Sequence, residues 1–218
     1  MPSTRDLDSL PDIDNLKRLM QSLAVLDVVV CRDCELRYFS FNSRWSPGEQ
    51  MGSMRDGQGD HYIALFNAAG GWLKGFDHES LMSPFRSDPP KIDDGMFGYM
   101  PAAFLLCLAE PAFVIEETTF GIWPRHEDNR WHRGTTKLDE SVDDPDGSAK
   151  LLRYLDGRPR TYRDWATDYY EREILLLMVT AVYSHLPLDQ RIVSGLNPDT
   201  SLHELLAEIE EIGYPVRK

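Results

Sequence analysis

Hydrophobic residues recur every three or four positions near the start of the chain. They are Ile13, Leu16, Leu19, Met20, Leu23, Leu26 and Val30. This spacing places them on one face of a helix. Asp12 or Asp14 can cap the helix, because a carboxylate accepts hydrogen bonds from the free amide groups of the first turn. The β-branched run at residues 28–30 favours an end of the helix there.

Aromatic and apolar segments predict the strands. Residues 36–42 are rich in aromatic side chains and predict a strand, and residues 43–60 then form a turn-rich stretch with four glycines. The apolar segments 61–66 and 72–76 are separated by five residues that include two glycines, which predicts a β-hairpin. Residues 113–123 carry alternating apolar and polar side chains and predict a further strand.

The connections between these elements are polar or rich in Pro and Gly. Residues 83–101 predict a surface connection, and residues 102–109 predict a short helix that ends near Pro111. Residues 125–147 are polar, with acidic residues concentrated at 139–146, and predict a mobile, solvated loop.

The C-terminal third is helical in pattern. Residues 161–185 predict one largely covered helix. A second helix follows at 202–212, where Ser201 and Glu204 match a capping box and Gly213 marks the end. The order of helix, strands and helices predicts a single α+β domain over residues 1–218, with a mainly antiparallel sheet packed by the N-terminal and C-terminal helices.

Composition narrows the function classes. The 218 residues include 23 basic and 36 acidic side chains, a formal charge of −13. A surface for nucleic acid is therefore not expected, because phosphate binding needs clustered cations. There is no apolar run of the roughly 20 residues that a bilayer helix needs, so we predict no membrane association. Three cysteines form no disulfide framework, and we predict a cytoplasmic protein.

The cysteine and histidine spacings do not predict a metal site. Cys31 and Cys34 form a C-x-x-C pair, but the pair follows the end of a helix, where the dipole disfavours the thiolate. A structural zinc needs four ligands, and Cys107, His126 or His132 would have to come from distant parts of the chain. His126 and His132 are six residues apart, whereas the zinc-protease pattern needs four. We predict ordinary cysteines and no metal.

Other ligand-binding motifs also fail. The acidic run at 139–147 lacks the acids and the final glutamate of an EF-hand. The glycine-bearing loop at 52–60 lacks the Gly-Lys-Ser/Thr ending of a phosphate-binding loop and leads into a strand. The sequence also lacks the Gly-x-Ser-x-Gly elbow of serine hydrolases. No cofactor is predicted.

Two loop segments supply candidate binding residues. One is the loop at 52–60 with the residue that follows it, and the other is the Asp-His-Glu run after the second hairpin strand. The candidate residues are Arg55, Asp60, His61, Asp77, His78 and Glu79. Carboxylates favour the charged form of a neighbouring histidine, but consecutive side chains rarely point the same way. Tight turns therefore remain the alternative to a site at both segments.

Two tryptophans complete the candidate set. Trp45 and Trp131 are surrounded by polar, turn-rich sequence, so we expect them to be exposed. Exposed aromatic side chains in an acidic chain favour a protein-binding surface.

Several short segments of the sequence resemble known bacterial proteins. They are residues 38–45, 52–62, 110–113, 118–120 and 211–215. Together they resemble a family of single-domain bacterial hypothetical proteins to which no activity is assigned. The size, acidity and helix-then-strand order are also similar to SMI1/KNR4-like bacterial immunity proteins, which implies binding to a toxin but transfers no site residue.

These observations give a leading hypothesis and an alternative. The leading hypothesis is a non-enzymatic protein-binding protein, such as an immunity protein that neutralises a basic toxin, because acidity steers a basic partner to its surface. The alternative is a small hydrolase with a site where residues 55–61 approach residues 77–79. An enclosed cleft with Asp60 facing His78 would favour the hydrolase. A DNA mimic ranks last, because the acids are scattered.

Overall fold

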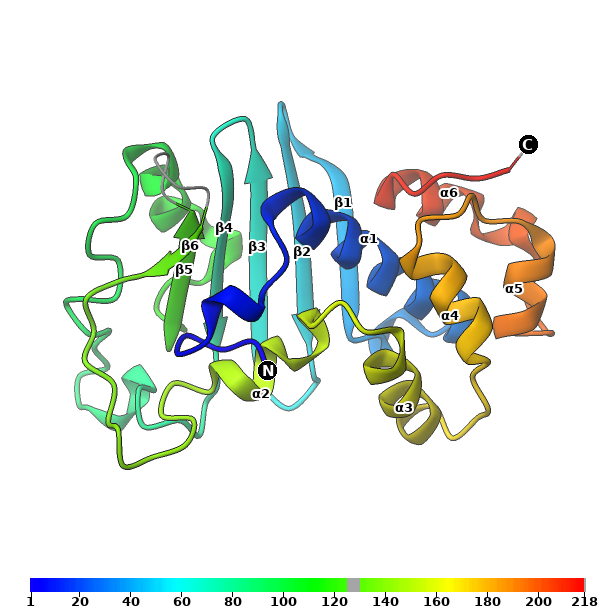
Figure 1. Cartoon of the computed structure of the whole chain (residues 1–218). Helices are drawn as coiled ribbons and strands as arrows, with labels where there is room; N and C mark the ends of the chain where they lie inside the picture. Colours follow the sequence, from blue (N-terminus) through cyan, green and yellow to red (C-terminus); the bar gives the residue numbers. More distant parts are fainter. Residues whose placement is uncertain (125–129, 218) are drawn as a thin grey trace.

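The centre of the protein is one six-stranded sheet. In this computed structural model, which describes residues 1–124 and 130–217, the strands follow the order β1-β2-β3-β4-β5-β6. They are β1 (Phe39–Ser46), β2 (Glu49–Arg55), β3 (His61–Asn67), β4 (Gly70–Phe76), β5 (Phe120–Pro124) and β6 (Trp131–Arg133). All neighbours pair antiparallel, and helices from both ends of the chain accompany the sheet (Figure 1). The predicted α+β fold is confirmed.

Helix α1 (Ile13–Val30) covers one face of the sheet and lies in front of β1 and β2 in Figure 1. The Asp12 side chain caps it by accepting from the amide of Asn15 at 2.9 Å, as predicted. Residues 28–30 remain helical and α1 ends at Val30, because Val28, Val29 and Val30 are buried in the core. This packing outweighs the weak preference of β-branched residues for strands.

The C-terminal part forms more helices than the sequence predicts. They are α2 (Ser148–Leu152), α3 (Pro159–Tyr169), α4 (Leu176–Tyr183), α5 (Gln190–Leu196) and α6 (Leu202–Ile212). The prediction of a single helix at 161–185 is wrong. Glu171 has a φ of 49°, which interrupts the helical backbone between α3 and α4. Helix α6 and its end at Gly213, with a φ of 73°, are confirmed. The Ser201 side chain caps no amide there, so the capping-box prediction is wrong.

Two strand predictions are corrected. The stretch 43–60 contains β2, in which a Cβ at position 52 would lie 2.5 Å from Met20 Cε. The glycine that suggested a turn therefore permits close approach of α1 to a strand. The strand predicted at 113–123 begins only at Phe120, because Val114 takes a left-handed conformation with a φ of 43°.

The other face of the sheet is covered by irregular structure. Short 3-10 helices η4 (Ala102–Ala109) and η5 (Pro111–Phe113) pack against Ile63, Leu65 and Trp72. Side chains alternate along a strand, so Tyr62 and Ala64 belong to the core under α1 instead. The sheet therefore separates two hydrophobic cores. The remaining 3-10 helices are η1 (Leu7–Ser9), η2 (Cys34–Leu36), η3 (Pro84–Arg86) and η6 (Arg153–Leu155).

The predicted loop at 125–147 contains β6, and its start, with His126, lies outside the described residues. Asp146 in this segment is buried and accepts a hydrogen bond from Thr4 Oγ1, so this acid is not solvated as predicted. Within the described residues, we find no helix of sufficient length and apolar character to cross a membrane.

Candidate functional site

A charged cluster forms where β3 begins and β4 ends. The pairing of His61 with Phe76 places Asp60, just before β3, beside Asp77 and His78, just after β4. Asp60 is 1% exposed, and its Oδ1 lies 2.6 Å from His78 Nδ1 and 3.0 Å from the His78 amide nitrogen. Because an ionised carboxylate can only accept, Nδ1 carries the proton. Glu79 adds a carboxylate oxygen 4.0 Å from His78 Nε2.

Lys150, on α2, completes the cluster. Its Nζ lies 2.5 Å from Asp60 Oδ2 and 3.6 Å from Asp77 Oδ2. The start of α2 comes this close because residue 147 is glycine, with a φ of 75°. A Cβ there would lie 2.2 Å from the Cβ of Asp77. The structure thus brings four of the predicted residues together and adds a lysine that the sequence did not indicate.

The charges in the cluster stabilise one another. Burial would raise the pKa of Asp60, but hydrogen bonds from Lys150 and His78 outweigh it and lower the pKa below the usual value. The hydrogen bond to Asp60 raises the pKa of His78. Burial would lower the pKa of Lys150, but its hydrogen bond to Asp60 and the charge of Asp77 raise it.

This arrangement has two chemical capacities. A buried carboxylate orients the His78 ring, whose side chain is 43% exposed, as a general base requires. Asp60, Asp77 and His78 also offer one ligand atom each, all within 4.8 Å of one another, so these residues could hold a metal ion.

A second polar group is buried between the sheet and the irregular structure that covers its second face. Lys74 is fully buried, and its Nζ lies 3.0 Å from Val114 O, 2.6 Å from Glu117 O and 3.0 Å from His61 Nε2. Burial lowers the pKa of Lys74 to about 7. Burial and the charge of Lys74 lower the pKa of His61 to about 4. His61 therefore accepts a hydrogen bond in the interior, and Arg55 is its register partner on β2.

The segment at 102–114, which we call the apolar segment, presents aliphatic side chains to solvent. Phe104, Cys107 and Phe113 are buried against the sheet. The exposed members are Ala102, Ala103, Leu105, Leu106, Ala109, Pro111, Ala112 and Val114. Leu106 is 83% exposed and Leu105 is 51% exposed. The sequence signal was a run of eight apolar residues between Pro101 and Glu110, too short a helix to bury all its sides.

The two tryptophans do not form this surface. Trp131 is only 8% exposed and its Nε1 donates to Pro11 O at 2.8 Å, so the prediction that it is exposed is wrong. A tryptophan in polar sequence is buried here because its indole nitrogen finds a carbonyl partner. Trp45 is half-buried and stacks on Phe113 with ring centroids 6.2 Å apart. The side chains that the apolar segment exposes are aliphatic instead.

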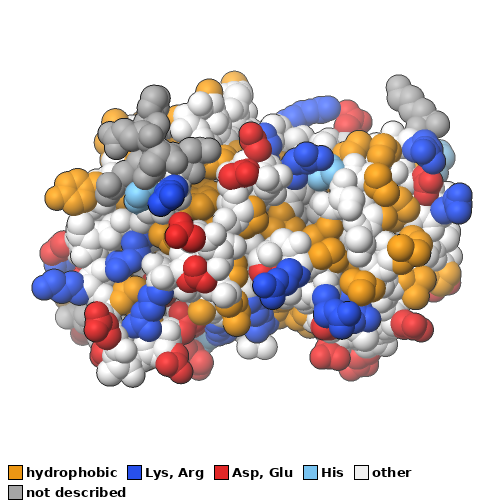
Figure 2. Space-filling model, in the orientation of Figure 1, with side chains coloured by type: hydrophobic (Ala, Val, Ile, Leu, Met, Phe, Trp, Pro, Cys, Tyr) orange, Lys and Arg blue, Asp and Glu red, His pale blue; other side chains and the backbone are white. Residues whose placement is uncertain are grey.

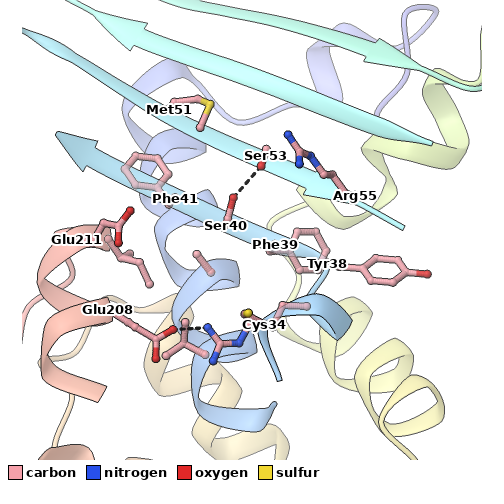
Figure 3. Close-up of a pocket in the computed structure, with 14 residues that line it drawn as sticks. Cys34, Tyr38, Phe39, Ser40, Phe41, Met51, Ser53, Arg55, Glu208 and Glu211 are labelled. Carbon is pink, nitrogen blue, oxygen red and sulfur yellow. Dashed lines mark hydrogen bonds and ion pairs between the residues drawn. The ribbon is translucent and has the colours of Figure 1, made fainter. Parts of the chain in front are cut away.

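A cavity of about 370 Å³ lies at the outer edge of β1, where α1 and α6 approach it (Figure 3). Figure 3 shows Glu208 on one side of this space, in an ion pair with Arg37, and Ser40 pointing to Ser53. Among the predicted site residues, Arg55 lines the cavity and Asp60 and His78 do not. The two latter residues are in direct contact, in place of facing one another across a cleft.

The cysteines are free thiols. Burial raises the pKa of Cys31, and Cys34 is exposed beside it at the start of η2. Cys107 is buried beneath the apolar segment, where burial raises its pKa to about 11. The environments of Cys31 and Cys107 favour the thiol form over the thiolate that metals and redox chemistry require.

Comparison with known proteins assigns no family. No family model, no curated protein and no solved structure matches the chain.

Proposed function

We propose that this chain is a non-enzymatic protein-binding protein whose apolar segment docks on a basic partner protein. The observation that carries the proposal is the exposure of Leu105 and Leu106 within a run that has no polar side chain from residue 102 to 109. Contiguous apolar side chains on a surface are typical of protein interaction sites. An aliphatic side chain of this kind can fill a pocket at the centre of an interface.

Charge supports a basic partner. The chain carries a formal charge of −13. Glu110 lies within the apolar segment and Glu49 lies close to it, so that the charges of both act on Cys107. A partner with an apolar pocket surrounded by Lys and Arg would gain from both features, because complementary charge accelerates docking. A basic toxin bound by an immunity protein, the function that the resemblance implies, is a partner of this kind.

The experiment is affinity capture from native lysate at low and moderate salt. It compares the unaltered chain with Leu106→Asp and with Leu177→Asp, a matched control on α4, where Leu177 is 72% exposed. We expect the unaltered chain and the control to retain the same basic protein and Leu106→Asp to lose it. Equal capture by Leu106→Asp, or no specific partner at either salt, would contradict the proposal.

The contact between Asp60 and His78 favours a second candidate, a small hydrolase. In this alternative, His78 Nε2 takes a proton from water while Asp60 holds the ring. The probe is 4-nitrophenyl acetate, tested with His78→Gln and with His203→Gln as an exposed control on α6. Hydrolysis that only His78→Gln abolishes would support the hydrolase. A rate equal to that of buffer would leave the binding proposal as the better account.

A further inference from the structure

Two buried carboxylates share one ammonium in the charged cluster. Asp60 and Asp77 are 1% and 7% exposed, and Lys150 Nζ contacts both. The charge of Asp56 also acts on Lys150. Two carboxylates therefore contact one lysine, and these contacts show that the space between Asp60 and Asp77 already accommodates a cation.

The ligand atoms around this space suit a metal ion. A carboxylate oxygen from Asp60, another from Asp77 and a ring nitrogen from His78 lie within 4.8 Å of one another. One imidazole nitrogen and two carboxylate oxygens, with water in the remaining positions, form a donor set that Zn²⁺ and Mn²⁺ accept. The exposed side of His78 gives an ion a path from solvent.

We propose that Asp60, Asp77 and His78 bind one divalent transition-metal ion and that Lys150 competes with this ion for the same carboxylates. The Lys150 side chain is 45% exposed, so its ammonium can turn to solvent when an ion enters. His78 Nδ1 then binds the ion and no longer donates its hydrogen bond to Asp60. The proton of Nδ1 moves to Nε2. This inference is independent of the apolar segment and of the proposed binding function, whereas it uses the same Asp60 and His78 as the hydrolase alternative.

Isothermal titration with ZnCl₂ tests the site. All proteins carry Cys31→Ser and Cys34→Ser, so that these thiols cannot take the metal. The comparison includes Lys150→Met, Asp60→Asn and a surface control, Lys91→Met, in which the lysine removed pairs with the exposed Asp94. We expect one ion per chain. Lys150→Met should bind it roughly tenfold more tightly, because the competing charge is gone.

The other variants should separate the site from adventitious binding. Asp60→Asn should lose the ion, and Lys91→Met should bind like the parent. A gain of affinity in Lys150→Met cannot come from unfolding, so this variant decides the question even if Asp60→Asn folds poorly. Unchanged affinity in Lys150→Met, or full binding by a folded Asp60→Asn, would overturn the proposal.

Discussion

The two faces of the sheet are covered in different ways. On one face, the long helix α1 and the C-terminal helices bury a continuous core that includes Leu16, Leu23 and Leu26. On the other face, short 3-10 helices bury Phe104, Cys107 and Phe113 against the sheet. They leave Leu105 and Leu106 in solvent. Regular helices bury one full stripe of side chains, whereas a 3-10 segment of eight residues cannot. We infer that the first face provides stability and the second presents a binding surface.

Hydrophobic exposure is not confined to the second face. Figure 2 shows hydrophobic side chains over α4 on the right of the molecule, where Leu175 and Leu177 are exposed. Helix α4 nevertheless buries Val179 and Val182 in the core under α1. This second exposed group therefore supplies the control that a test of the apolar segment requires.

The largest expected effect is a difference in the free energy of unfolding between variants on the two faces of the sheet. Leu23→Ala removes a fully buried side chain from α1 and should lower the free energy of unfolding by about 2–5 kcal/mol. Leu106→Ala should change it by no more than about 0.5 kcal/mol, because the side chain is already in water. Urea unfolding of both variants measures the difference. Similar losses in both would show that the apolar segment is part of the folding core.

Lys74 tests whether its buried ammonium group stabilises the irregular structure that covers the second face of the sheet. The pKa of Lys74 is lowered to about 7 in the folded chain from 10.5 in the unfolded chain, so between these values only the unfolded chain binds the proton. The contribution of Lys74 to stability should therefore rise as the pH increases from 7 to 10.5. The Lys74→Met variant should show a smaller rise. In this variant, the backbone amides near residues 114–119 should exchange with deuterium faster than in the unaltered chain. A pH profile parallel to that of the unaltered chain would contradict this account.

Asp27 gives the opposite pH dependence on the helical face. It accepts from the amides of Tyr38 and Phe39 and from the Tyr162 hydroxyl, and burial raises its pKa to about 7. The folded chain keeps the proton longer than the unfolded chain, so the contribution of Asp27 to stability falls as the pH rises from about 4 to 7. Asp27→Asn should gain in stability relative to the unaltered chain over this interval. A constant difference between the two would show that Asp27 does not titrate there.

Local patterns explain which parts of the fold the sequence predicts. The stripe of α1, the β3–β4 hairpin and α6 follow from residues close in the chain, and all three are confirmed. The hydrophobic periodicity does not indicate the left-handed backbone of Glu171 that interrupts the predicted helix. The glycine inside β2 depends on a tertiary contact with Met20, which no local pattern shows.

The same distinction applies to the site. Asp60, Asp77 and His78 come together because a hairpin joins them, and the hairpin was predictable. Lys150 lies 90 residues from Asp60, and Lys74 bonds carbonyls 40 and 43 residues away, so no local pattern reveals these contacts. Polar neighbours suggested exposure of Trp131, but its contact with Pro11, 120 residues away, buries it.

Photo-cross-linking from position 106 tests the central claim most directly. A photoreactive amino acid replaces Leu106 in one protein and Leu177 in another, and the adducts formed in native lysate are identified by mass spectrometry. We predict that position 106 traps one basic protein and that position 177 does not. No adduct at position 106, the same adducts at both positions, or an acidic partner would contradict docking through the apolar segment.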